Sequence, residues 1–483
     1  MFRVDKNMRH YISRAIQFAR NNKTLVFLLI IINGIVLVNA ILHDPTIGYD
    51  AIDYFKYIKI LSTGRFPTQT QTREFFSPPL PFIFPSLFMS LFHVDILVAA
   101  KLAQLINVLL SIGVTVTLIN TCKIIQRNSN YLQIASLAFL GILPVYYKSM
   151  AFVRGESYSI FLAVLSTKII LEILIQEQRS FAKALNLGIC IGLLLLTRQW
   201  VFFLLPAMMI TFVIDALKHP ERIPDYLKIS VVSLLVILII SSWFYIHLFR
   251  SAGSPMAFNR AAADQLNFSN QPRSFYLGRG SGRLFNDPVR VSFPRQFIPI
   301  FYSEVWGDYW CYFSVFGWDS RESGYVAGDL LAYYVSITPE WLTTNRFSMG
   351  GYLGRVNLVS ILPTLLAFLG FCSGFIAFCY VLLQKRSTAE NIGYSLFMLL
   401  ILSSMLGYLW FHLKYPVPGE GDTIKATYML QIFPFIALLT GGVMERIRRI
   451  SVFPYYSLLG ALAIVFLHNI NTMITHYSSI WVP

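Results

Sequence analysis

The sequence contains little charge. Only 13% of its 483 residues are Asp, Glu, Lys or Arg, whereas a soluble domain carries about 25%. Hydrophobic residues make up 55% of the chain, and the mean hydropathy is +0.58. This composition excludes an ordinary soluble protein. It predicts an all-α protein that crosses a lipid bilayer many times, because a helix satisfies its own backbone hydrogen bonds there.

Acidic residues are scarcer than basic ones, with 24 against 39, and the net charge is +15. No basic face or nucleic-acid motif accompanies this surplus, so we expect no nucleic acid partner. Membrane topology explains the charge better, because cytoplasmic loops collect Lys and Arg. With the basic N-terminal segment in the cytoplasm, alternating spans place these short basic groups inside as well: Lys123/Arg127, Arg179/Lys183, Lys218/Arg222/Lys228, Lys385/Arg386 and Arg446/Arg448/Arg449.

Cysteine and the common soluble-enzyme motifs are also sparse. None of the five cysteines forms a metal-type pair, and only Cys311 lies in a long polar segment. We therefore expect no intrachain disulfide outside the membrane. No Ser-His-Asp arrangement, His-x-x-x-His motif or Gly-rich nucleotide fingerprint is visible. That absence argues against a soluble nucleotide-sugar donor bound at a Rossmann-type site.

Apolar runs predict about eleven membrane-spanning helices, of which the first is a signal anchor rather than a cleavable signal. The run 80–93 is too short to span and carries Pro81 and Pro85, so we interpret it as a re-entrant or surface segment. The predicted spans lie near 24–42, 96–120, 131–150, 156–175, 184–197, 200–217, 227–249, 357–383, 392–411, 426–444 and 455–475.

Three parts of the chain follow from these spans. Residues 1–249 form an N-terminal transmembrane module whose first outer loop is 43–79, and residues 357–483 form the C-terminal helices. Between them lies an extracytoplasmic insert, 250–356, with ten Arg, eight Asp or Glu and no Lys. It is too long and too aromatic for a simple linker. We expect a small ordered domain over the mouth of the helix bundle.

The first outer loop holds two carboxylates at the membrane surface, Asp50 and Asp53. At helical spacing they share one face with Tyr54 and Tyr57. Either acid could serve as a general base that takes a proton from an acceptor hydroxyl. The structural alternative makes them a helix cap and a surface charge.

A third carboxylate of this loop, Glu74, precedes Pro78-Pro79. It could bind a divalent cation or a hydroxyl of a donor sugar, or simply pair with the neighbouring Arg73. A lone carboxylate is weak evidence for a metal, because hard cations require several oxygen ligands. A divalent metal ion at Glu74 is therefore the one cofactor that the sequence suggests, and none is certain.

Three cationic residues lie at predicted outer membrane boundaries: Arg154, Arg198 and Lys425. Arginine offers a planar bidentate fork and stays charged, which suits a lipid phosphate. The alternative is snorkelling of long side chains at helix ends. Because all three fall on the same predicted side, we retain them as candidate phosphate ligands.

Several short motifs, in this order, resemble those of GT-C glycosyltransferases, which are polytopic enzymes that take a sugar from a polyprenyl-phosphate carrier. The motifs are Asp50 with Tyr54 and Tyr57, then Gly64-Arg65-Phe66-Pro67, then Glu74 with Ser77-Pro78-Pro79-Leu80, then Gly192 to Arg198, then Lys425 to Pro434. The nearest comparison is the family 39-like branch, which includes protein O-mannosyltransferases and the aminoarabinose lipid A transferase. The likeness covers roughly 24–249 and 357–445.

The resemblance implies transfer of a sugar to a hydroxyl acceptor, either a glycan, a lipid or a protein, on the extracytoplasmic face. It implies that Asp50 is the catalytic carboxylate and that Tyr54 and Tyr57 belong with the donor-binding cations. The chain departs from the family in Ala51, where many relatives carry a second acid, and in the spacing of Glu74 from Pro-Pro. The choice between Asp50 and Asp53 thus stays open.

The expected location is a bacterial cytoplasmic membrane rather than the endoplasmic reticulum, with the N-terminus in the cytoplasm, and the expected chemistry inverts the anomeric centre. Two rival functions remain. A transporter or flippase of a lipid-linked glycan predicts charge through the middle of the bundle, where Lys101, Lys168 and Glu172 are the main examples. A non-catalytic scaffold would use the insert to bind a partner.

Overall fold

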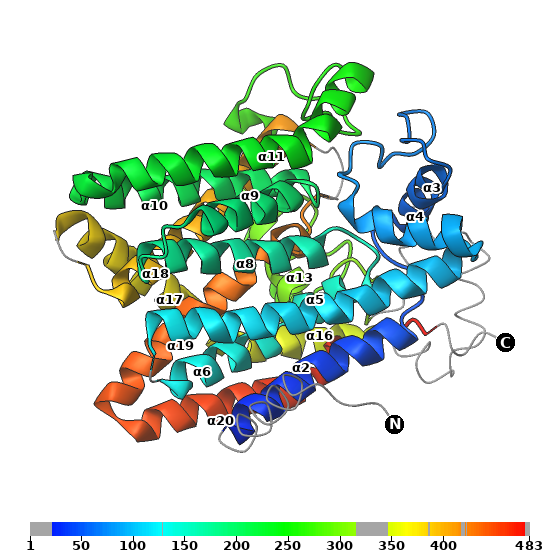
Figure 1. Ribbon diagram of the computed structural model, residues 1–483. Helices are drawn as coiled ribbons and strands as arrows, with labels where there is room; N and C mark the ends of the chain where they lie inside the picture. Colours follow the sequence, from blue (N-terminus) through cyan, green and yellow to red (C-terminus); the bar gives the residue numbers. More distant parts are fainter. Residues whose placement is uncertain are drawn as a thin grey trace, which may run out of the picture.

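The computed structural model describes residues 22–127, 129–314, 346–384, 387–416, 421 and 423–478 (Figure 1). These residues form helices, turns and loops, with one isolated β-bridge between His43 and Ser478. Polar residues begin several of the helices by accepting a backbone N–H, as Asp95, Ser129, Ser180 and Thr388 do.

Nine helices in the described residues are long and apolar enough to cross a membrane. This confirms the all-α, multi-pass class, and the protein is an integral membrane protein. The nine are α2 (Lys23–Leu42), α5 (Ile96–Ile125), α8 (Glu156–Leu174), η1 with α10 (Gln199–Lys218), η2 with α11 (Pro220–Ala252), α16 with α17 (Gly351–Leu383 of Arg346–Leu383), α18 (Ala389–Lys414), η5 with α19 (Ala426–Ile450) and α20 with η6 (Val452–Thr472).

The other two predicted spans take different forms. The run expected at 131–150 is broken into α6 (Asn130–Gly141) and α7 (Pro144–Ala151), which meet at 65°. Pro144 opens α7, since a proline cannot continue the preceding helix. The run expected at 184–197 is α9 (Phe181–Leu195), a shorter apolar helix. Gly188 lets α9 pack closely on α11, since a Cβ at this position would lie only 2.8 Å from Val236.

Two shorter helices follow α2, namely α3 (Ala51–Ser62) and α4 (Leu80–Phe92). α4 is the run that the sequence predicts not to span, and its 13 residues rise about 20 Å. Figure 1 shows α3 and α4 beside the beginning of α5, at the end of the bundle opposite the C-terminal ends of α5, α10 and α19. Of the basic residues predicted to be cytoplasmic, Lys123, Lys218, Arg448 and Arg449 lie in the last turns of α5, α10 and α19, at that opposite end.

The described part of the insert folds against the end of the bundle that holds α3. It consists of η3 (Phe268–Asn270), α12 (Arg273–Leu277), η4 (Gly282–Phe285) and α13 (Phe297–Trp306), joined by irregular loops. α11 extends beyond 249 to Ala252, and α16 already begins at Arg346; residues 315–345 lie outside the described part. Aromatic side chains join the insert to the bundle in one buried cluster, which includes Ile47, Tyr49, Phe152, Phe293, Tyr309, Trp310 and Ile424.

Candidate active site

Asp50 lies in a tight turn just before α3. Gly48 and Asp50 both have positive φ, at 146° and 59°, and a Cβ on Gly48 would come within 3.2 Å of the Phe152 ring. The backbone carbonyl of Asp50 accepts the N–H groups of Asp53 and Tyr54, while its carboxylate makes no cap hydrogen bond. Asp50 therefore precedes the helix in a left-handed conformation, which corrects the expectation that it shares one helical face with Asp53.

The carboxylate of Asp50 lies between two cations from distant parts of the chain. Its Oδ2 is 3.5 Å from Lys425 Nζ and 4.0 Å from Arg154 Nη1. Burial raises the pKa of Asp50, but Lys425, Arg154 and Arg198 outweigh it and hold this pKa below its ordinary value. These cations therefore favour the ionised carboxylate, which is the form that can accept a proton.

Behind Asp50, one glutamate joins the two arginines. Glu156, the first residue of α8, lies 3.3 Å from Arg154 Nη2 and 2.9 Å from Arg198 Nη2. The side chains of all three are at most 4% exposed. The two corners that carry these arginines touch at Gly155, where a Cβ would lie 2.3 Å from the carbonyl oxygen of Thr197. Only glycine allows this approach, which brings the two guanidinium groups together.

Arg198 extends from this pair to the first outer loop. Its Nη2 donates to the hydroxyl of Tyr54 at 2.8 Å, and its Nη1 lies 3.9 Å from Glu74. Ser77 Oγ donates to the same Glu74 carboxylate at 2.5 Å. Burial and the nearby charge of Asp50 raise the pKa of Glu74 despite Arg198. The pKa values of Asp50 and Glu74 thus shift in opposite directions, as they do in sites where two carboxylates have different roles.

These side chains border a cavity of about 370 Å³. Among the residues that the sequence singled out, Asp50, Tyr54, Glu74, Arg198 and Lys425 line it. Arg154 is not part of the wall but contacts Asp50 from behind. The remaining wall includes Tyr49, Arg73, Phe76, Trp200, Phe258, Asn259, Arg260, Arg290, Trp310, Tyr312, Thr423 and Tyr428.

Two candidates from the first loop lie outside the cavity wall. Asp53 is one turn into α3, where its carboxylate meets Lys56 at 3.3 Å and its carbonyl accepts the Thr72 hydroxyl at 2.9 Å. Tyr57 donates to the Ser77 carbonyl at 3.0 Å. Asp53 thus contacts the first loop at Thr72, Tyr57 contacts it at Ser77, and neither lines the cavity.

Sequence reasoning missed several residues of the site. Glu156 had a signal in the run Arg154-Gly155-Glu156, since an acid beside an arginine at a helix start suggests a pair. Trp310 and Tyr312 belong to an aromatic run of the insert, from Tyr302 to Phe313; they are buried and also line the cavity. Arg260 and Arg290 carried no pattern that distinguished them from other arginines of the insert.

The described residues contain no group of three or more His, Cys, Asp or Glu side chains arranged to hold a metal ion. Glu74 instead meets a hydroxyl and a guanidinium. A hard cation prefers several oxygen ligands, and here it would lie among positive side chains. Metal binding by Glu74 stays a prediction.

No family model matches the sequence, and no curated protein matches it. The structure is similar to an oligosaccharyltransferase from Archaeoglobus fulgidus in complex with Zn and sulfate, with a TM-score of 0.49, 13% identity, and coverage of 94% of this chain and 53% of that one. It is also similar to Archaeoglobus fulgidus AglB in complex with an inhibitory peptide and a dolichol-phosphate, with a TM-score of 0.45, 11% identity, and coverage of 93% and 56%.

A third similar structure is ArnT from Cupriavidus metallidurans bound to undecaprenyl phosphate, with a TM-score of 0.35, 12% identity, and coverage of 86% of this chain and 76% of that one. The chain spans about half the length of the oligosaccharyltransferases that it matches.

Proposed function

We propose that the chain is a GT-C-type glycosyltransferase that moves a sugar from a polyprenyl-phosphate carrier to a hydroxyl acceptor on the outer face of a bacterial cytoplasmic membrane. The observation that carries this proposal is the carboxylate of Asp50 in the wall of a cavity, 3.5 Å from Lys425 and 4.0 Å from Arg154. A base beside cations is what transfer from a lipid phosphate requires. The order of the sequence motifs supports the same family.

In the proposed reaction Asp50 takes the proton from the acceptor hydroxyl. The acceptor oxygen then forms a bond to the anomeric carbon as the bond from that carbon to the phosphate oxygen breaks. The electron pair leaves with the polyprenyl phosphate. Because one displacement occurs at the anomeric carbon, its configuration inverts.

The cations stabilise the departing phosphate. Lys425 and Arg198 line the cavity and would contact the phosphate directly. Arg154 does not line it and would act through its ion pair with Asp50. Glu156 holds the two arginines in place. Such donors are effective because they are already oriented in a site from which water is largely excluded. Glu74, with its raised pKa, is proposed to hydrogen-bond a hydroxyl of the donor sugar.

The transporter alternative gains no support from the three charged residues that the sequence singled out within the predicted spans, Lys101, Lys168 and Glu172. Glu172 accepts from both Lys168 and Lys183, and Lys101 donates to the carbonyls of Ile41 and His43 at the end of α2. In the part of the chain that the structure describes, each of these groups is satisfied by partners close to it. We therefore favour the enzyme.

The test separates binding from chemistry in the purified protein in nanodiscs. Undecaprenyl phosphate binding is measured by native mass spectrometry, and transfer is measured with a panel of labelled polyprenyl-phosphate sugars. We expect Asp50→Asn to bind the lipid but to lose transfer by about 10²–10⁴-fold, and Asp53→Asn to retain both. Transfer at the wild-type rate by a folded Asp50→Asn protein would contradict the role of Asp50 as the base. Full activity of that variant with loss in Asp53→Asn would move the role to Asp53.

A further inference from the structure

A buried ionic network joins the insert to the turn that holds Asp50. The hydroxyl of Tyr49 donates to Glu304 on α13, and Lys148 on α7 donates to the same carboxylate. Lys148 Nζ also lies 3.6 Å from Asp308, which follows α13. The charged side chains of this network are at most 1% exposed. Buried charges of this kind are retained only when they are paired and hydrogen-bonded.

The network also fixes a second part of the cavity wall. The Asp308 carboxylate accepts the backbone N–H groups of Tyr312, Phe313 and Ser314, at 3.3, 2.8 and 2.8 Å. The Tyr312 ring then packs edge-on against Tyr49, with centroids 5.0 Å apart. One ionic cluster thus orients two neighbouring tyrosines of the cavity.

Several groups contact Tyr49, which directly precedes Asp50 in the chain. The Tyr49 carbonyl accepts Arg154 Nη1 at 3.2 Å, and Lys425 Nζ lies 4.7 Å from the centre of its ring. A left-handed conformation at a residue other than glycine is unfavourable, and it persists where the surroundings determine it. The fixed position of Tyr49 therefore determines where the Asp50 carboxylate meets Lys425.

We propose that Glu304 is a positioning residue for the reaction. It does not line the cavity, and it acts through the Tyr49 hydroxyl to hold the Asp50 carboxylate against Lys425. The insert, which lies outside the sequence resemblance, is then a working part of the site. This inference rests on the proposed function for its kinetic consequence, but its geometric consequence is independent of that function.

Tyr49→Phe removes the hydroxyl and leaves the ring. We expect kcat to fall about tenfold to a hundredfold, because a misplacement of about 1 Å can cost 10²-fold in rate, while KM and the affinity for undecaprenyl phosphate stay unchanged. The matched control is Tyr455→Phe. Tyr455 is also fully buried, and its hydroxyl donates to the Tyr131 carbonyl at 2.9 Å, away from the insert. The Tyr455→Phe variant should lose about as much thermal stability as Tyr49→Phe and keep the wild-type kcat.

Glu304→Gln tests whether the two residues act as one unit. The amide oxygen can still accept the Tyr49 hydroxyl, so this variant should keep more activity than Glu304→Ala. The Tyr49→Phe/Glu304→Ala double variant should lose no more kcat than Glu304→Ala alone, since the shared contact is lost only once. Multiplying losses, or a Tyr49→Phe enzyme with wild-type kcat, would overturn the proposal.

A structure of the Tyr49→Phe protein by cryo-electron microscopy gives a readout besides activity. We expect the distance from Asp50 Oδ2 to Lys425 Nζ to lengthen from 3.5 Å. An unchanged distance refutes the positioning role even if catalysis depends on Asp50. A lengthened distance in a protein whose Asp50→Asn variant is fully active supports the geometry and refutes the proposed function, so the two failures are distinguishable.

Discussion

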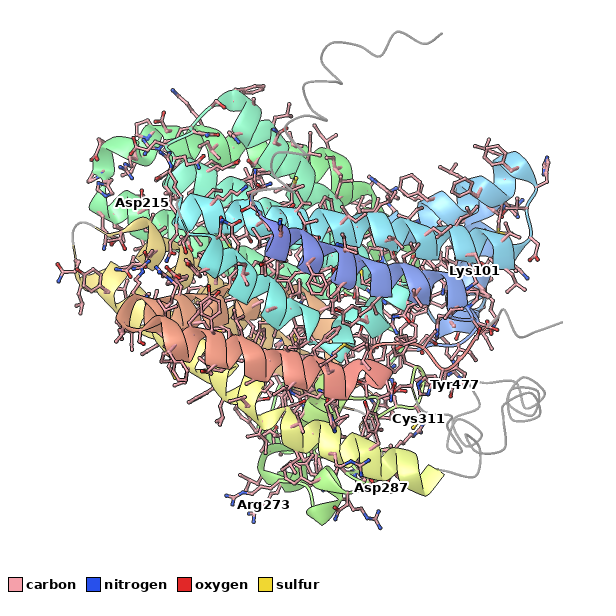
Figure 2. All side chains as sticks on the ribbon, turned by 90° about the horizontal axis from the view of Figure 1, so that it is seen from below. Lys101, Asp215, Arg273, Asp287, Cys311 and Tyr477 are labelled. Atoms are coloured by element: carbon pink, nitrogen blue, oxygen red, sulfur yellow. The ribbon has the colours of Figure 1, made fainter. Side chains whose placement is uncertain are left out.

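Two cavities of almost equal size lie at opposite ends of the bundle. The candidate active site measures about 370 Å³, and a second cavity, lined by Leu174, Asp215, Lys218 and Arg222 among others, measures about 360 Å³. α8 runs from one to the other, from Glu156 to Leu174. In Figure 2, Asp215 lies at the end of the molecule opposite Lys101 and Cys311. Volume alone does not distinguish them.

Their charged groups do. In the second cavity Arg222 pairs with Asp215 at 3.2 Å and with Glu177 at 2.7 Å, and the Glu177 side chain is 58% exposed. These pairs connect neighbouring helix ends, as surface ion pairs commonly do. In the first cavity the charges come from four distant segments, those of Asp50, Arg154, Arg198 and Lys425, and none of the four side chains is more than 18% exposed. Convergence of buried charge, which is costly to maintain, is the feature that indicates chemistry.

The largest contrast we expect is in stability. Glu156→Ala leaves Arg154 and Arg198 buried without their shared carboxylate, and breaking a buried pair in this way costs about 3–5 kcal/mol. Glu177→Ala removes a mostly exposed partner, and such pairs contribute about 0–1 kcal/mol. Thermal unfolding in the same detergent measures both variants. Equal shifts in Tm would show that the charges of the first cavity are as weakly coupled as those of the second.

This contrast also shows what the sequence could and could not predict. The spans followed from hydropathy, because a bilayer requires long apolar helices. Asp50 and Lys425 stood out as charges at span ends, yet the left-handed conformation of Asp50 and the close approach of Gly48 to Phe152 are features that periodicity does not encode. The pairing of Tyr49 with Glu304 joins residues 255 positions apart. A contact at that separation leaves no pattern in a single sequence.

Lipid affinity should separate the two cavities next. Lys425→Ala removes a charged hydrogen-bond donor from the proposed phosphate site, which is worth about 1.5–3 kcal/mol and therefore about tenfold to a hundredfold in Kd for undecaprenyl phosphate. Lys218→Ala is the matched control, because Lys218 lines the second cavity and donates to the Gln384 carbonyl. Native mass spectrometry measures both. A larger loss in Lys218→Ala would place the lipid phosphate in the second cavity and contradict the proposed phosphate site.

The pH dependence sharpens the electrostatic difference. Lys425, Arg154 and Arg198 hold the pKa of Asp50 below its ordinary value in spite of burial. Because the folded pKa is lowered, the ionised carboxylate stabilises the folded state above the unfolded pKa, and this contribution is lost as pH falls through the folded pKa. Titration of Asp50 should therefore leave kcat/KM unchanged between pH 7 and 5, because this interval lies above the ordinary pKa of an aspartate, 3.8.

Lys425→Ala removes the cation that contributes most to this effect. The pKa of Asp50 should rise, and the acid limb of kcat/KM should move to higher pH, while Lys218→Ala leaves it in place. Profiles of the two variants and the wild type under identical salt measure the difference. An acid limb that does not move in Lys425→Ala would mean that another group titrates there.

The smallest effect we expect is that of a chelator. In the first cavity Arg198 and Lys425 already supply positive charge beside Glu74 and Asp50, and the described residues offer no cluster of three metal-ligating side chains. A divalent cation would add charge where cations already lie, so EDTA should leave transfer within about twofold, the range of a surface perturbation of about 0.5 kcal/mol. The control adds Mg²⁺ or Mn²⁺ back after chelation. A different result would make Glu74 a metal ligand and replace its proposed contact with the sugar. That result is loss of transfer with EDTA and recovery with the metal in the wild type, without recovery in Glu74→Gln.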